Sequence, residues 1–173
     1  MDLKEKIRNI PDFPKKGIIF RDITTLLQDP QATKKAIQGM LEPFKEEKID
    51  VVIGTESRGF IFGSIIAFEL GASFVPVRKP GKLPFETEKA SYEKEYGSDE
   101  LEMHKDAIKK GDKILVVDDL LATGGTAVAV KKLVEKLGGE IVGFCFLIEL
   151  SFLKGKEKLK PYKTFSLIDY TSE

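Results

Sequence analysis

The stretch "ILVVDDLLATGGT", residues 114–126, indicates the fold class more clearly than any other part of the sequence. Four apolar residues lead into Asp118 and Asp119, and the chain then turns through two glycines into a helical pattern. A short apolar run that is followed by a turn and a helix is typical of a buried parallel strand. It also predicts a ligand site, because open parallel sheets bind ligands beyond the carboxyl ends of their strands.

Further strands and helices are expected on both sides of this stretch. Apolar runs suited to buried strands lie at residues 50–54, 73–77, 113–118, 140–150 and, more weakly, 164–168. Helical spacing of apolar residues appears at 31–48, where Pro43 predicts a kink or break, at 59–70, which is apolar nearly all round and expected to be buried, and at 126–137. The alternation predicts an α/β fold with an open, mainly parallel twisted sheet flanked by helices.

Two segments interrupt the alternation within an expected single domain, residues 1–173. The N-terminal segment, approximately residues 1–30, is interpreted as a small hood. The polar, glutamate-rich segment at approximately residues 80–108 is interpreted as a mobile lid, since long polar connections in compact domains are usually binding loops.

Composition limits the possible partners. The chain has 173 residues, of which 42% are hydrophobic, and 28 basic residues balance 28 acidic ones, so no overall charge favours nucleic acid or an anionic membrane. No apolar stretch resembles an export signal or a membrane span. The one cysteine, Cys145, lies in an apolar run and is expected to be a buried, inert thiol. We interpret the protein as cytoplasmic.

The acid pair and the glycine turn point to one kind of ligand. Residues 123–126 can surround a phosphate with backbone N–H groups and hydroxyls at a helix N-terminus, although neither a Walker loop nor a dinucleotide fingerprint is present. Asp118 and Asp119 would repel a bare polyphosphate, so they are expected to face sugar hydroxyls or Mg²⁺. A ribose 5'-phosphate satisfies both halves; a solvated aspartate turn is the plain alternative.

The same stretch resembles the phosphoribosyl-pyrophosphate-binding motif of type I phosphoribosyltransferases. Its residues are most similar to those of the adenine phosphoribosyltransferases. Five further blocks resemble that family in order: "FPKKGIIFRDIT", "ESRGFIFG", "RKPGKLP", "ASYEKEYGSDELEMHKDA" and "LIELSFLKGKEKL". The resemblance covers essentially the whole chain. It implies an enzyme that converts adenine and phosphoribosyl pyrophosphate to AMP and pyrophosphate in purine salvage. It also implies Mg²⁺, held mainly by the substrate with Asp118 as a possible ligand, and a homodimer.

The resemblance also implies roles for individual residues. The ribose 5-phosphate would be bound by Asp118, Asp119, Ala122, Thr123, Gly124, Gly125 and Thr126. Pyrophosphate would be bound by Glu56, Ser57, Arg58, Arg78, Lys79 and Lys82, with a cis peptide bond before Ser57. Pro80 departs from the family pattern and puts the details of that basic turn in doubt. A surface ion pair is the alternative role of Arg58.

Adenine would be bound by Ile19, Phe20, Arg21 and Leu150, with Phe20 stacking on the purine and backbone groups reading its edge. From sequence alone, Phe20 fits a core position better than a stacking role, and only the family resemblance favours stacking. The implied catalytic residues are Glu95, Tyr96 and Arg58, with Glu95 near the reacting purine nitrogen. His104 is expected to be solvated, because no nucleophile pattern accompanies it.

Two other functions are less consistent with the sequence. A transferase for a 6-oxopurine base is disfavoured by the "FRDI" and "EYG" blocks. A non-enzymatic regulator that binds nucleic acid would need a basic face or an added domain, and the balanced charge does not suggest the former.

Overall fold

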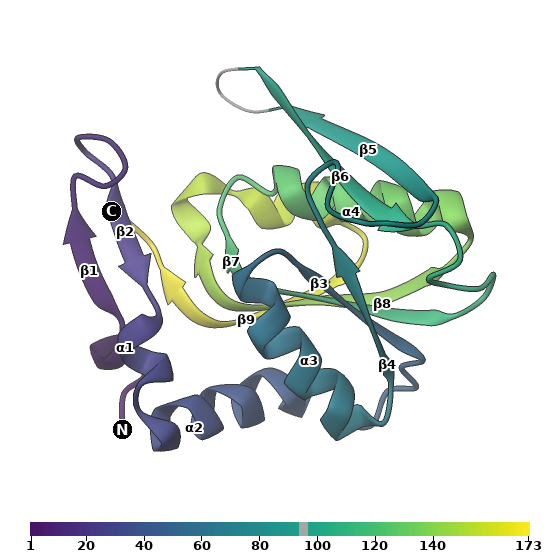
Figure 1. The fold of residues 1–173 in the computed structure, drawn as a ribbon. Coiled ribbons are helices and arrows are strands. Elements are labelled where there is room, and N and C mark those ends of the chain that lie inside the picture. The colour runs from purple at the N-terminus through teal and green to yellow at the C-terminus, as the bar shows by residue number, and fades with distance from the viewer. Residues whose placement is uncertain (94–96) are drawn as a thin grey trace.

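The computed structural model describes residues 1–93 and 97–173, which form a five-stranded parallel sheet with helices on both faces (Figure 1). The strand order is β4-β3-β7-β8-β9, and every neighbouring pair is parallel. The strands are β1 (Arg8–Pro11), β2 (Ile19–Asp22), β3 (Val51–Thr55), β4 (Ser73–Val77), β5 (Thr87–Glu93), β6 (Ser98–His104), β7 (Lys113–Leu121), β8 (Glu140–Leu150) and β9 (Lys163–Tyr170). The helices are α1 (Thr24–Leu27), α2 (Pro30–Leu41), α3 (Arg58–Leu70) and α4 (Gly125–Leu137), with short 3₁₀ helices η1 (Lys4–Lys6), η2 (Glu42–Phe44), η3 (Ser151–Leu153) and η4 (Gly155–Leu159).

Both faces of the sheet are buried, which explains why its strands are apolar without alternation. In β7, Leu115 and Val117 face the cluster that contains α2 and α3, whereas Ile114 and Val116 face the cluster that contains α4. Side chains of a strand alternate between faces, so a strand covered on both sides needs an apolar residue at each position.

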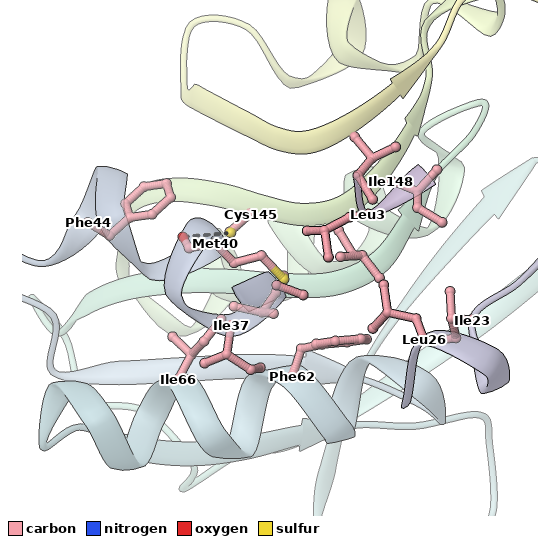
Figure 2. Packing of buried hydrophobic residues seen from close by; sticks show 14 of the residues in the cluster. Leu3, Ile23, Leu26, Ile37, Met40, Phe44, Phe62, Ile66, Cys145 and Ile148 are labelled. Atoms are coloured by element: carbon pink, nitrogen blue, oxygen red, sulfur yellow. Dashed lines mark hydrogen bonds between the residues drawn. The ribbon is translucent and has the colours of Figure 1, made fainter. Parts of the chain in front are cut away.

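The core under α2 and α3 is closely packed (Figure 2). Met40, Phe44, Phe62 and Ile66 are fully buried there, and the thiol of Cys145 donates a hydrogen bond to the carbonyl oxygen of Met40 at 3.3 Å. Burial raises the pKa of Cys145 far above its usual range, so the thiol stays protonated. The prediction of a buried, inert cysteine is confirmed.

One helix prediction is confirmed and one needs correction. The helical segment expected at 31–48 breaks after Leu41 and gives way to η2, which contains Pro43, as the proline predicted. The helix at 59–70 is not buried all round: Phe68 is 83% exposed, and Ile61 and Ile65 are also exposed on the same side of α3. The prediction that α3 is buried all round is therefore wrong: α3 packs on the sheet by one face only.

The N-terminal hood consists of the antiparallel pair β1 and β2 with α1, and the C-terminal end of the chain lies beside it (Figure 1). Arg8 and Thr24 hold the carboxylate of Asp22 at its base, with an Arg8–Asp22 distance of 2.6 Å. Hydrogen bonds from the hydroxyl and the backbone N–H of Thr24, followed by that from Arg8, lower the pKa of Asp22 to about 2. The hood is therefore anchored by a charged group that stays ionised.

The polar segment expected as a lid contains the antiparallel hairpin β5–β6, which stands over α4 (Figure 1). One face of the hairpin is apolar: Ala90, Leu101 and Met103 are buried against α4.

His104 is half-buried and not solvated as the sequence predicted. It accepts a hydrogen bond from the N–H of Phe85 at 3.4 Å, and its ring packs edge-on against the ring of Phe85. Within the described residues, no helix is long and apolar enough to cross a membrane.

Candidate active site

A cleft of about 630 Å³ opens at the carboxyl edge of the sheet, where β3 and β7 lie side by side. Its walls come from the ends of these strands, the first turns of α3 and α4, and the hairpin β5–β6. The lining residues are Thr55, Glu56, Ser57, Arg58, Lys79, Tyr92, Glu93, Asp118, Asp119, Leu120, Leu121, Ala122, Thr123, Gly124, Gly125, Thr126, Ala127 and Phe146. Every residue predicted to bind ribose 5-phosphate is among them.

Residues 122–126, here called the phosphate loop, connect β7 to α4. Gly124 takes a φ of 85° at the N-terminal boundary of α4, a conformation that a side chain disfavours. The loop is packed against the hairpin, because a Cβ added to Gly125 would lie 2.9 Å from the ring of Tyr92. The loop therefore presents the N-terminal N–H groups of α4 toward the cleft, as an anion site requires.

The acid pair lies inside β7, because this strand continues to Leu121 and does not end at residue 118 as the sequence predicted. Asp118 accepts a hydrogen bond from the N–H of Asp119 at 2.9 Å, and its carboxylate packs against α3 where Gly59 leaves room. Burial and the negative charge of Asp119 raise the pKa of Asp118 well above its usual range. The fold therefore holds a carboxylate in a place that disfavours its charge, which is typical of functional sites.

Arg58 connects the acid pair to the hood. Its Nε donates to the carboxylate of Asp119 at 2.6 Å, and its guanidinium carbon lies 5.2 Å from the centre of the Phe20 ring. Arg58 does form an ion pair, which is its alternative role, but the partner is Asp119, which lines the cleft. Arg58 is thus placed between a carboxylate and an aromatic ring from two different segments.

Residues 78–82, here called the basic loop, make three contacts with the carboxylate of Glu56. Glu56 accepts a hydrogen bond from the backbone N–H of Lys79 at 2.6 Å, and it forms ion pairs with Lys82 at 2.5 Å and with Arg78 at 3.4 Å. Burial by itself would raise the pKa of Glu56, but hydrogen bonds from Lys82 and Lys79 outweigh it and lower the pKa. Glu56 thus holds the cationic side chains of Arg78 and Lys82, whereas the ammonium of Lys79 pairs with Asp99 at 3.4 Å. The Glu56–Ser57 peptide bond is cis, as the family resemblance implied.

The residues expected around adenine lie outside the lining of this cleft. The ring of Phe20 meets the ring of Phe13 edge-on at 5.2 Å. The side chain of Arg21 points to the C-terminal segment, where its guanidinium stacks on Tyr170 at 4.0 Å. The N–H of Ile19 donates to the carboxylate of Glu173 at 3.1 Å, and Leu150 is half-buried against the core. Of these residues, only Phe20 is tied to the cleft, through Arg58.

Some cleft residues were not predicted from the sequence, and two predicted catalytic residues lie outside the described part of the chain. Glu95 and Tyr96 lie outside the described residues. Tyr92, Glu93 and Phe146 line the cleft but were not selected. Tyr92 and Glu93 belong to the block "ASYEKEYGSDELEMHKDA", which had marked their neighbourhood without distinguishing them. Phe146 lies inside an apolar strand, where no local signal separates a cleft residue from a core residue.

The family is established by comparison with known proteins. Residues 22–171 match the family model described as a phosphoribosyl transferase domain. The chain therefore belongs to the phosphoribosyltransferase family, and the predicted family and fold class are confirmed.

Full-length relatives of this chain carry the name adenine phosphoribosyltransferase. The adenine phosphoribosyltransferase of Clostridium perfringens is 59% identical over 170 residues, which cover 98% of this chain and 99% of that protein. The crystal structure of adenine phosphoribosyltransferase from Thermoanaerobacter pseudethanolicus matches with a TM-score of 0.95 and 52% identity, covering 97% of this chain and 98% of the other. The Saccharomyces cerevisiae enzyme, solved with an imino-altritol bisphosphate and adenine, matches with a TM-score of 0.90 and 47% identity, covering 95% and 96% of the two chains.

Proposed function

We propose that this protein is an enzyme that transfers ribose 5-phosphate from phosphoribosyl pyrophosphate to adenine and releases AMP and pyrophosphate. One observation carries the proposal: a single cleft is lined by the phosphate loop, by the acid pair of β7 and by the cationic residues Arg58 and Lys79. A ligand that has a phosphate at one end, hydroxyls in the middle and a pyrophosphate at the other end matches these groups. The names of the full-length relatives supply adenine as the base.

The proposed roles follow the chemistry of the groups. The N–H groups and hydroxyls of the phosphate loop bind the 5'-phosphate, and Asp118 and Asp119 accept hydrogen bonds from the ribose hydroxyls. Arg58 and the basic loop, through Arg78, Lys79 and Lys82, bind the pyrophosphate together with the backbone of Glu56 and Ser57. These cations are paired with carboxylates, so the pyrophosphate would replace one anionic partner by another.

In the reaction, the bond between the anomeric carbon and the pyrophosphate oxygen breaks, and the electron pair leaves with pyrophosphate. Positive charge develops on the ribose, beside the two carboxylates, which stabilise it. The purine nitrogen then forms the new bond, and its proton passes to Glu95, with Tyr96 beside it in sequence. The hood would bind adenine through the ring of Phe20, the backbone of Ile19 and Arg21, and Leu150.

Mg²⁺ is part of the proposal, as a partner of the substrate. Among the described residues, no group of three or more side chains of the metal-binding types is assembled. That arrangement fits a cation that keeps several waters and is held by substrate phosphates with one or two carboxylates, of which Asp118 is the candidate here. When bound, Mg²⁺ would neutralise charge on the departing pyrophosphate.

A base panel tests the proposal most directly. The protein is incubated with phosphoribosyl pyrophosphate, Mg²⁺ and one of adenine, hypoxanthine, guanine or xanthine, and nucleotide formation is followed by chromatography. We expect AMP from adenine and no nucleotide from the other bases. Product from a 6-oxopurine, without product from adenine, would transfer the assignment to the rival base class, and no product from any base would remove the enzyme assignment.

A homodimer and a cytoplasmic location complete the proposal. Ile61, Ile65 and Phe68 form an exposed apolar stripe along α3, and such a stripe is typical of a protein contact. We expect sedimentation to give a dimer and Phe68→Glu to give a monomer; a monomeric parent protein would contradict the dimer. The cytoplasm is supported by Cys145, which is a free thiol.

A further inference from the structure

The segment after β8, residues 151–159, lies directly behind the phosphate loop. It consists of η3 and η4, and Gly155 and Leu159 are its buried residues. Leu159 is fully buried in the same core cluster as α4, which fixes η4 on that side of the sheet. The phosphate loop is therefore supported by a segment that follows the loop by about thirty residues in sequence and does not line the cleft.

The contact between this segment and the loop is made by backbone atoms. A Cβ placed on Gly155 would lie 2.2 Å from the carbonyl oxygen of Ala122 and 3.0 Å from the amide nitrogen of Gly124. In the opposite direction, a Cβ on Gly124 would lie 2.8 Å from the carbonyl oxygen of Gly155. The two glycines thus face each other with no room for a methyl group on either side.

Space, rather than backbone conformation, requires the glycine at 155. Gly155 is not among the residues with a positive φ, whereas its neighbour Lys154 adopts a φ of 56° without being a glycine. A side chain at 155 would therefore be tolerated by the local backbone and excluded only by the loop. Because backbone atoms cannot rotate away as a flexible side chain can, even a methyl group must displace the loop or η4.

We propose that Gly155 is a positioning residue for the phosphate loop: it lets η4 pack against the loop and hold the loop N–H groups at the distance that the 5'-phosphate requires. This inference rests on the proposed function and assigns a role to a residue outside the cleft. Relief of the overlap needs a movement of about 1 Å, and a displacement of that size can reduce binding or rate about 100-fold.

The test is the variant Gly155→Ala, which adds the smallest possible side chain. Binding of ribose 5-phosphate and of phosphoribosyl pyrophosphate is measured by calorimetry, and KM is measured for each substrate. We expect both dissociation constants to rise about 10- to 100-fold and KM for phosphoribosyl pyrophosphate to rise more than KM for adenine. A merely structural role would lower thermal stability without this selectivity.

Gly143→Ala is the matched control. A Cβ there would lie 2.6 Å from the ring of Phe44 and 3.0 Å from the carbonyl oxygen of Lys163, so it is similarly crowded, but Gly143 lies toward the opposite end of β8. It should lose stability and keep the dissociation constant for ribose 5-phosphate within about twofold of the parent protein. Equal weakening of binding in both variants would overturn the proposal.

If Gly155→Ala does not fold, Leu159→Val takes its place. It loosens the anchor of η4 without adding an atom near the loop, and we expect the dissociation constant for ribose 5-phosphate to rise about threefold or more. A folded variant of either kind that binds ribose 5-phosphate as the parent does overturns the role of Gly155. Failure of the parent protein to make AMP would instead overturn the proposed function, so the two failures are distinguishable.

Discussion

Replacement of Asp118 by Asn is expected to stabilise the folded protein at pH 7 while weakening the binding of phosphoribosyl pyrophosphate. The substitution is nearly isosteric. The side-chain oxygen can still accept the N–H of Asp119 at 2.9 Å, and the space next to Gly59, where a Cβ would lie 2.6 Å from that oxygen, is left unchanged. The variant therefore differs from the parent almost only in charge.

The sign follows from the pKa of Asp118, which burial and the charge of Asp119 raise in the folded state. An unfolded chain ionises this carboxyl at a pH of about 3.9, whereas the folded chain resists ionisation, so folding becomes less favourable as pH rises from that value through the folded pKa. Removal of the unfavourable charge by Asp118→Asn should raise the free energy of unfolding by about 1–2 kcal/mol. For a chain of this length that corresponds to a rise in Tm of about 2–8 °C.

Thermal unfolding of parent and variant is measured without ligand between pH 4 and pH 8, and binding is measured by calorimetry at pH 7. The advantage of Asp118→Asn should grow as pH rises from 4 to 8 and should vanish as pH falls below about 4, because there the parent carboxyl becomes protonated in both states. Asp119→Asn is the control, and it should lose stability because Arg58 loses its ion-pair partner. A variant Asp118→Asn that is less stable than the parent at pH 7 would refute the reasoning.

Three further substitutions test neighbouring parts of the site. Gly125→Val should abolish AMP binding in a protein that remains folded by circular dichroism, because even one Cβ would lie 2.9 Å from Tyr92; normal binding would put the phosphate elsewhere. Glu56→Gln should cost about 1 kcal/mol at pH 7, measured by urea unfolding, because the pKa of Glu56 is lowered. This loss should vanish as pH falls through the folded pKa of Glu56, and a loss independent of pH would exclude the charge as its cause. Glu95→Leu should slow AMP formation in single-turnover assays about 10²- to 10⁴-fold while phosphoribosyl pyrophosphate still binds; an unchanged chemical step would remove Glu95 from catalysis.

Much of the fold was predictable because the sheet is buried on both faces. The runs at 73–77 and 140–150 coincide with β4 and β8, and the acid pair and glycine turn lie where α/β sheets place ligands. The hairpin β5–β6 was not predicted, because charged residues on its exposed face mask the alternation of Ala90, Leu101 and Met103. The exposed side of α3 was missed because an exposed apolar residue and a buried one look alike in a nearly continuous apolar sequence.

The sequence alone determined the family and the residue types of the site, because the glycine turn, the acids and the basic residues are local in the chain and need no partner to be recognised. Which of these residues contact one another depends on the tertiary structure. It paired Arg58 with Asp119, gathered Arg78, Lys79 and Lys82 around Glu56, and placed Gly155 behind Gly124. These contacts join segments far apart in sequence, and their distances depend on how helices and strands pack, which local residue patterns do not specify.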